Sequence, residues 1–208
     1  MKLRWAMFIS IVLLHSQCNW PSNMVSNSFN KLNESINKST SFIINEADSE
    51  YNAITRRAGE GSPIRLEVDS IRLEAKNTAN YLDSLYSQLK VLLQDTLNME
   101  KLTPEYMSQL ATEKCLNEHF LRLHSICVKC IKGLNGQMRE GGHEIDSVMK
   151  RETNLASHRG WTIEEFKGVP VFASITLLNR FKSDCQMAEL ITLKEVNTSL
   201  NVTKNTSP

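Results

Sequence analysis

The sequence predicts an all-α protein. Apolar residues recur at steps of three and four over four long stretches, and such steps place side chains on one face of a helix. Glycine and proline, which interrupt helices, number only 8 and 5 in 208 residues, and long segments lack both. No segment alternates apolar and polar residues for long enough to predict a sheet. We therefore expect an antiparallel four-helix bundle, preceded by an N-terminal signal or membrane-anchor segment.

The first two helices are expected over residues 23–57 and 63–93, and each carries one apolar stripe at helical spacing. Gly59 and Gly61 separate them, and Ser62 followed by Pro63 is typical of a helix start. The stripe of the first helix comprises Val25, Phe29, Leu32, Ile36, Ile43, Ala47, Tyr51 and Ile54. The stripe of the second comprises Ile64, Val68, Ile71, Ala75, Leu82, Leu85, Leu89 and Leu92. Charged residues of the second helix are interpreted as a solvated face: Asp69, Arg72, Glu74 and Lys76.

The last two helices are expected over residues 104–139 and 170–196. Gly141 and Gly142 are predicted to end the third helix. Residues 143–160 are expected to form a polar loop, with a short helical piece inside it left open, and residues 197–208 a disordered polar tail. The fourth helix begins at Pro170, whose ring suits a first helical turn. Its apolar face is wide and comprises Val171, Phe172, Ile175, Leu177, Leu178, Phe181, Cys185, Ala188, Leu190, Ile191 and Thr192. So wide a face predicts a helix packed against several others.

Residues 1–20 have the organisation of an export signal. Lys2 and Arg4 precede an apolar run from Trp5 to Leu14, which is shorter than the roughly 20 apolar residues that span a membrane. Three alternatives stay open: a cleaved signal peptide, a lipoprotein signal lipidated at Cys18, and an uncleaved membrane anchor. All three predict an exported protein.

Charge and motif content exclude several classes of function. A net charge of +1 argues against a nucleic-acid binder, whose affinity depends on neutralising phosphates. The sequence has no nucleophile elbow, phosphate loop or dinucleotide fingerprint. His119 and His124 miss the four-residue spacing of a helical zinc pair, so we interpret them as solvated or capping residues. We expect no enzymatic activity, no metal and no cofactor.

The cysteines are candidates for a structural role. Cys127 and Cys130 form a C-x-x-C in mid-helix, without the strand-to-helix context of a thioredoxin-type redox site. We interpret them as core thiols or disulfide members. Together with Cys115 and Cys185 they allow three pairings, and a bridge from Cys185 to the third helix would tie two helices together.

The stretch from Trp161 to Val196 carries a family resemblance. Its pattern W-x(4)-F-x-G-V-P-V-x-A-x-I-T-L-L, followed by D-x(3)-A-E, resembles the last helix of the N-terminal periplasmic domain of the gliding-motility and type IX secretion family GldM, also called PorM. The matching residues are Trp161, Phe166, Pro170, Ala173, Ile175, Thr176, Leu177, Leu178, Asp184, Ala188 and Glu189. The segment from Tyr81 to Leu85 also resembles the end of that family's second helix.

The resemblance implies a non-catalytic role in the periplasm for residues 23–196, with an anchor in the inner membrane or a lipid tether as alternatives. Members of this family form dimers whose membrane helices join a proton-driven inner-membrane motor, and their periplasmic parts carry force outward. Those proteins continue into β-rich domains that reach the outer-membrane partners, and the sequence of 208 residues contains only the helical part. We therefore expect this chain to act as a structural or accessory component that pairs with itself or with related motility or secretion subunits. Trp161, Phe166 and Pro170, at the entry to the last helix, form a candidate partner surface.

Five N-x-Ser/Thr sequons keep a second class open. They would be glycosylation sites in a eukaryotic secreted chain. With the cysteines of the third and fourth helices, they would suit a secreted four-helix signalling protein of the cytokine type. The sequons are Asn33, Asn37, Asn197, Asn201 and Asn205.

Overall fold

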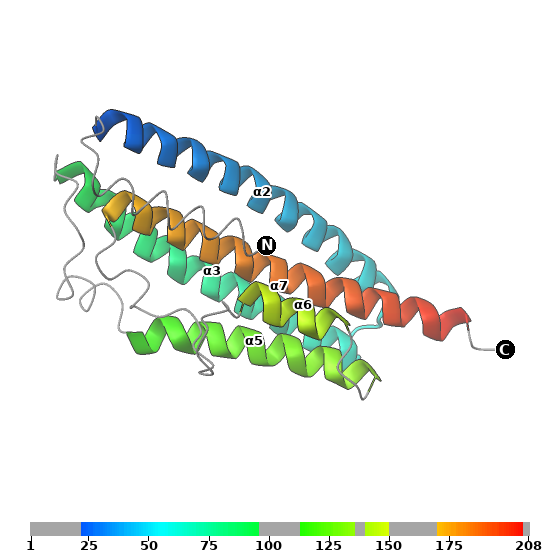
Figure 1. Cartoon of the computed structure of the whole chain (residues 1–208). Helices are drawn as coiled ribbons and strands as arrows, with labels where there is room; N and C mark the ends of the chain where they lie inside the picture. Colours follow the sequence, from blue (N-terminus) through cyan, green and yellow to red (C-terminus); the bar gives the residue numbers. More distant parts are fainter. Residues whose placement is uncertain (1–21, 96–112, 136–139, 150–169, 206–208) are drawn as a thin grey trace.

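The computed structural model describes residues 22–95, 113–135, 140–149 and 170–205 (Figure 1). These residues form five helices: α2 (Ser22–Arg57), α3 (Pro63–Asp95), α5 (Glu113–Asn135), α6 (Glu140–Met149) and α7 (Val171–Asn205). No strand occurs among them. The prediction of an all-α chain is therefore confirmed, and the expected bounds of α2 and α3 are met to within two residues.

Helix α7 lies in the middle of the molecule and contacts α2, α3, α5 and α6 (Figure 1). Nearly every residue between Val171 and Val196 is buried or half-buried, on all sides of the helix. Its apolar side chains form the core together with one stripe from each of the other helices. A helix that is buried all round needs neighbours on every side, as the wide apolar face predicted.

Helix α7 runs parallel to α2 and antiparallel to α3. Along α2 and α7 the contacts advance together, from Phe29 with Phe172 to Glu50 with Asn197. Along α3 and α7 they run in opposite order, from Asp83 with Lys182 to Arg72 with Glu189. The expected antiparallel bundle is therefore wrong in the direction of its last helix, because α7 runs parallel to α2. The stretch between α5 and α7 contains a fifth helix, α6, and the chain returns along α5 before α7 begins.

The third predicted helix, over residues 104–139, corresponds to α5, and a separate short helix, α6, follows it. Residues 104–112 and 136–139 lie outside the described residues, and α5 covers Glu113–Asn135. Gly141 and Gly142, expected to end a helix, lie in the first turn of α6. The rest of α6 lies in residues 143–160, where the sequence left a short helical piece open. Ile145 and Met149 of α6 are fully buried against α5 and α7. Burial of this short apolar face outweighs the low helix propensity of two glycines near the helix start.

The tail expected to be disordered is helical as far as Asn205. Asn197 donates a hydrogen bond to Glu50 at 2.6 Å, and Arg57 donates to Asn197 and Asn201. These contacts with α2 extend α7 beyond its apolar stripe. Residues 206–208 lie outside the described residues.

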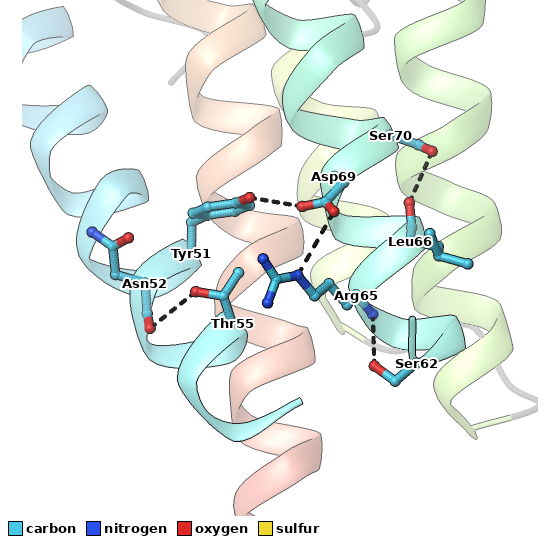
Figure 2. A network of polar contacts seen from close by, with 8 residues as sticks. All are labelled: Tyr51, Asn52, Thr55, Ser62, Arg65, Leu66, Asp69 and Ser70. Carbon is cyan, nitrogen blue, oxygen red and sulfur yellow. Dashed lines mark hydrogen bonds and ion pairs between the residues drawn. The ribbon is translucent and has the colours of Figure 1, made fainter. Parts of the chain in front are cut away.

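A tight turn over residues 58–62 joins α2 to α3. Figure 2 shows residues on either side of it, from Tyr51 on α2 to Ser70 on α3. Gly61 has a φ of 75°, a conformation that favours glycine. Ser62 caps α3 as predicted, because its Oγ accepts a hydrogen bond from the backbone N–H of Arg65 at 3.3 Å. Above the turn, the hydroxyl of Tyr51 donates to Asp69 at 2.7 Å and ties α2 to α3.

None of the helices in the described ranges is long and apolar enough to cross a membrane. The predicted signal or anchor over residues 1–20 lies outside those ranges and stays a prediction.

Candidate functional site: charged residues inside the bundle

Charged side chains from three helices meet at Arg72 of α3, in a group that we name the Arg72 cluster (Asp48, Tyr51, Arg72 and Glu189). The guanidinium of Arg72 forms an ion pair with Asp48 of α2 and lies 3.6 Å from Oε1 of Glu189 of α7. It also lies over the ring of Tyr51, with Cζ 4.4 Å from the ring centroid. One cation therefore links α2, α3 and α7.

Glu189 is the most unusual member of the Arg72 cluster. It is 4% exposed, and burial raises the pKa of its carboxyl from 4.5 to about 7. Arg72 lowers this pKa and Asp48 raises it, but neither effect is as large as that of burial. Because Arg72 is shared with Asp48, it does not fully compensate for the lost hydration of Glu189.

A second group, the Glu74 cluster, joins α3 to α5 (Glu74, Tyr81, His119 and Arg122). Glu74 is 6% exposed, and its two carboxylate oxygens each lie 3.8 Å from a nitrogen, one of His119 and one of Arg122. The ring of His119 stacks on Tyr81 with centroids 4.7 Å apart. A buried carboxylate is thus held between two basic groups of the neighbouring helix.

The histidines and charged residues of α3 differ from their sequence interpretation. His119 faces Glu74, and His124 lies 2.6 Å from Asp146 of α6, so both histidines make contacts between helices. Arg72 and Glu74 were expected on a solvated face, but the structure buries Glu74 and half-buries Arg72. They were missed because charges that flank an apolar stripe look solvated until the partner helices are known.

Three cysteines lie in the core as free thiols: Cys127, Cys130 and Cys185. Burial raises the pKa of Cys127 and Cys130 to about 12 and that of Cys185 well above its usual value. The thiol of Cys185 donates to the carbonyl oxygen of Ala75 at 3.4 Å. Thiols that stay protonated at neutral pH are poor nucleophiles, which does not favour a redox role for the C-x-x-C. The proposed disulfides, including any with Cys115, whose side chain is not described, stay predictions.

The candidate partner surface and lipidation site fall mostly outside the described ranges, which exclude Trp161, Phe166 and Cys18. Pro170 is half-buried, and its carbonyl oxygen accepts hydrogen bonds from the backbone N–H and hydroxyl of Ser174 at 3.0 and 3.2 Å. It thereby caps the start of α7.

The two clusters are suited to holding helices together. In each cluster a buried carboxylate lies near a cation of another helix: Glu189 of α7 near Arg72 of α3, and Glu74 of α3 near Arg122 of α5. Among the described residues, no group of three His, Cys, Asp or Glu side chains could hold a metal ion.

No protein-family model, curated protein sequence or solved structure matches this chain.

Proposed function

We propose that this chain is an exported, non-catalytic protein in which four long helices form one bundle, and that it serves as a structural or accessory component of a gliding-motility or type IX secretion machinery. The observation that carries this proposal is the GldM-like pattern in Val171–Glu189. It falls on α7, the helix that contacts all the others.

The matching residues of α7 are those on which its packing depends. Ala173, Ile175, Leu178 and Ala188 are buried, and Glu189 belongs to the Arg72 cluster. Asp184 is also buried and pairs with Arg180 at 3.0 Å. Buried and paired residues depend on how a domain folds. A match at such residues therefore supports a shared fold more than a coincidence of composition.

The direction of the first two helices weighs against the cytokine alternative. Cytokine bundles have an up-up-down-down order with two long crossover connections. Here α2 and α3 are joined by a tight turn and run in opposite directions, since Tyr51 pairs with Asp69 and Asp48 with Arg72.

The sequons weigh in the same direction. Asn33 accepts a hydrogen bond from Asn179 at 2.9 Å, and the side chains of Asn197 and Asn201 bind Arg57. The amide nitrogen of Asn197, to which a glycan would be attached, donates to Glu50, so glycosylation there would disrupt a contact between α2 and α7. Asn37 is exposed and free of this constraint.

Two measurements in the native host test the proposal. Intact-mass spectrometry of soluble and membrane fractions should find the chain outside the cytoplasm, either cleaved near Cys18, lipidated there, or uncut in the inner membrane. Cross-linking followed by affinity capture should then recover motility or secretion subunits. An unprocessed cytoplasmic chain, or capture that recovers no such subunit, would overturn the proposal.

A further inference from the structure

The guanidinium of Arg72 on α3 faces two carboxylates through different nitrogen atoms. Nη2 forms the ion pair with Asp48 of α2. Nη1 lies 3.6 Å from Oε1 of Glu189 of α7, is buried, and makes no hydrogen bond within the part of the chain that the structure describes. Buried donors are nearly always paired, and this distance is too long for a hydrogen bond. A buried donor without a partner therefore lies directly beside a buried acid.

The two carboxylates differ in their access to water. The side chain of Asp48 is 45% exposed, whereas that of Glu189 is 5% exposed. When both are ionised, water hydrates Asp48, but the hydration that Glu189 has lost is replaced only by a protein group such as Arg72. When Glu189 is protonated and neutral, its attraction for the cation is weak, and Asp48 holds Arg72. The protonation of Glu189 therefore decides which carboxylate binds Arg72 more strongly.

The other titratable groups around Glu189 keep one charge state near neutral pH or are bound elsewhere. Cys127 of α5 and Cys185 of α7 stay protonated, because burial raises the pKa of Cys127 to about 12 and that of Cys185 well above its usual value. The hydrogen bond from Tyr51 of α2 to α3 raises the pKa of its hydroxyl. Further charged groups of these helices are bound in pairs: Glu46 with Lys194, Glu50 with Asn197, Asp83 with Lys182, Glu74 with Arg122, and Asp146 of α6 with His124. The charge of Glu189 therefore acts mainly on the Arg72 cluster.

Arg72 also connects α3 to the middle of α2. Besides its ion pair with Asp48, it lies over the ring of Tyr51, with Cζ 4.4 Å from the ring centroid. Because the guanidinium is a rigid plane, a shift that shortens the Nη1–Oε1 distance from 3.6 Å to about 2.9 Å also moves Nη2 and the face that covers the ring. A stronger bond to Glu189 therefore weakens both contacts of Arg72 with α2. The hydrogen bond of Tyr51 with Asp69 (Figure 2) then remains between α2 and α3.

We propose that Arg72 is a pH-dependent latch between α2 and α3. With Glu189 protonated, Arg72 binds Asp48 and covers Tyr51, and the middle of α2 is held against α3. With Glu189 ionised, Arg72 binds Glu189, and this part of α2 is held mainly by its apolar stripe on α7. Since burial raises the pKa of Glu189 to about 7, the latch releases as the pH rises through that value. The latch goes beyond the proposed function, because it requires neither export nor a partner.

The effect of Asp48→Asn tests the latch, because Asp48 stabilises α2 only while Arg72 binds it. Hydrogen exchange of the purified full chain, followed by mass spectrometry, compares variant and parent at the same pH, so the effect of pH on the chemical exchange rate cancels. At about pH 5.5, Asp48→Asn should accelerate exchange roughly tenfold in peptides from residues 45–54 of α2. At about pH 8, the two chains should exchange alike.

The Glu189→Gln background separates the latch from a general effect of pH. Its amide stays neutral, so adding Asp48→Asn should accelerate exchange roughly tenfold at both pH values. The matched control is Glu34→Gln, at an exposed position of α2, which should keep the pH dependence of the parent chain. If Asp48→Asn has the same effect at both pH values in the parent chain, or if its effect still depends on pH in the Glu189→Gln background, the latch is wrong.

NMR of chains with isotope-labelled tyrosine tests the movement of Arg72 itself. The ring signals of Tyr51, assigned with Tyr51→Phe, should shift with a midpoint at about pH 7 in the parent chain and stay constant in Glu189→Gln. The reason is that the cation leaves the face of the ring only when Glu189 ionises. Ring signals that stay constant between about pH 5.5 and about pH 8 in the parent chain would overturn the proposal. None of these outcomes bears on export or on the capture of secretion subunits.

Discussion

Helices α2 and α7 have almost the same length, 36 and 35 residues, and pack side by side. Helix α2 has one side in solvent, whereas α7 is surrounded by other helices. Helix α2 buries one stripe and leaves polar side chains such as Asn45 and Ser49 in solvent. Helix α7 buries its polar residues as well, and each of these needs a partner. Thr176 and Thr192 bind the carbonyl oxygens four residues before them, and Asn179 binds Asn33 of α2.

The position of a helix in the bundle, rather than its hydrophobicity alone, therefore determines whether a polar side chain is hydrated or needs a partner within the protein. On α2 a charge can be solvated. On α7 a charge such as Glu189 remains only because α3 supplies a cation.

The largest expected difference is between two phenylalanines. Phe181 of α7 is fully buried, whereas Phe42 of α2 is 69% exposed. Phe181→Ala should lower the free energy of unfolding by about 3–5 kcal/mol because it leaves a cavity in the core. Phe42→Ala should change it by less than about 0.5 kcal/mol. Urea denaturation followed by circular dichroism measures both, and equal effects would mean that α7 is not the central helix.

The second prediction concerns the buried carboxylate of α7. Since the pKa of Glu189 is about 7 in the folded state and near 4.5 when solvated, the folded state holds the proton more tightly. Ionisation of Glu189 should therefore lower the free energy of unfolding as the pH rises from about 4.5 to about 7. Glu189→Gln should remove this slope and raise the free energy of unfolding at pH 8 by on the order of 2 kcal/mol.

Unfolding curves of the parent chain, Glu189→Gln and Glu34→Gln between pH 4 and pH 8 provide the measurement. Glu34 is exposed on α2, so its replacement should leave the profile unchanged. A Glu189→Gln variant that keeps the parent slope, or is less stable at pH 8, would show that Arg72 fully compensates the buried charge.

The smallest effect is expected where the two helices meet in solvent. Lys194 of α7 and Glu46 of α2 lie 2.6 Å apart, with side chains 47% and 35% exposed. A double-mutant cycle with Lys194→Met and Glu46→Gln should give a coupling of about 0.5 kcal/mol that decreases at high salt. A coupling several times larger would place this pair in a far less hydrated environment than its exposure indicates.

The sequence predicted those parts of the fold that depend on local spacing. The stripes, the Ser62 cap and the Pro170 start placed α2, α3 and the first residue of α7 to within two residues. A short helical piece after residue 143 was left open, but its start was misplaced because Gly141-Gly142 was interpreted as a stop, although Ile145, Val148 and Met149 have helical spacing. The parallel packing of α7 on α2 was also missed, since periodicity gives a helix a face but not a direction.

The Arg72 and Glu74 clusters could not have been predicted in the same way. Asp48, Arg72 and Glu189 lie far apart in the sequence, and only the packed helices bring them together. A signal was nevertheless present, because Glu189 interrupts one of the most apolar stretches of the chain. A charge in such a position is rare without a buried partner.

The parallel packing of α2 on α7 has a consequence for how the chain folds. The hydrogen bonds between these helices join residues 140 to 147 positions apart, from Arg57 with Asn197 to Glu50 with Asn197. Such distant contacts slow folding, because the entropy of closing a long loop is lost before the contacts stabilise the fold. Until residues 171–205 are available, α2 and α3 have no central helix on which to bury their stripes. An emerging chain would therefore remain incompletely folded until its last helix is made.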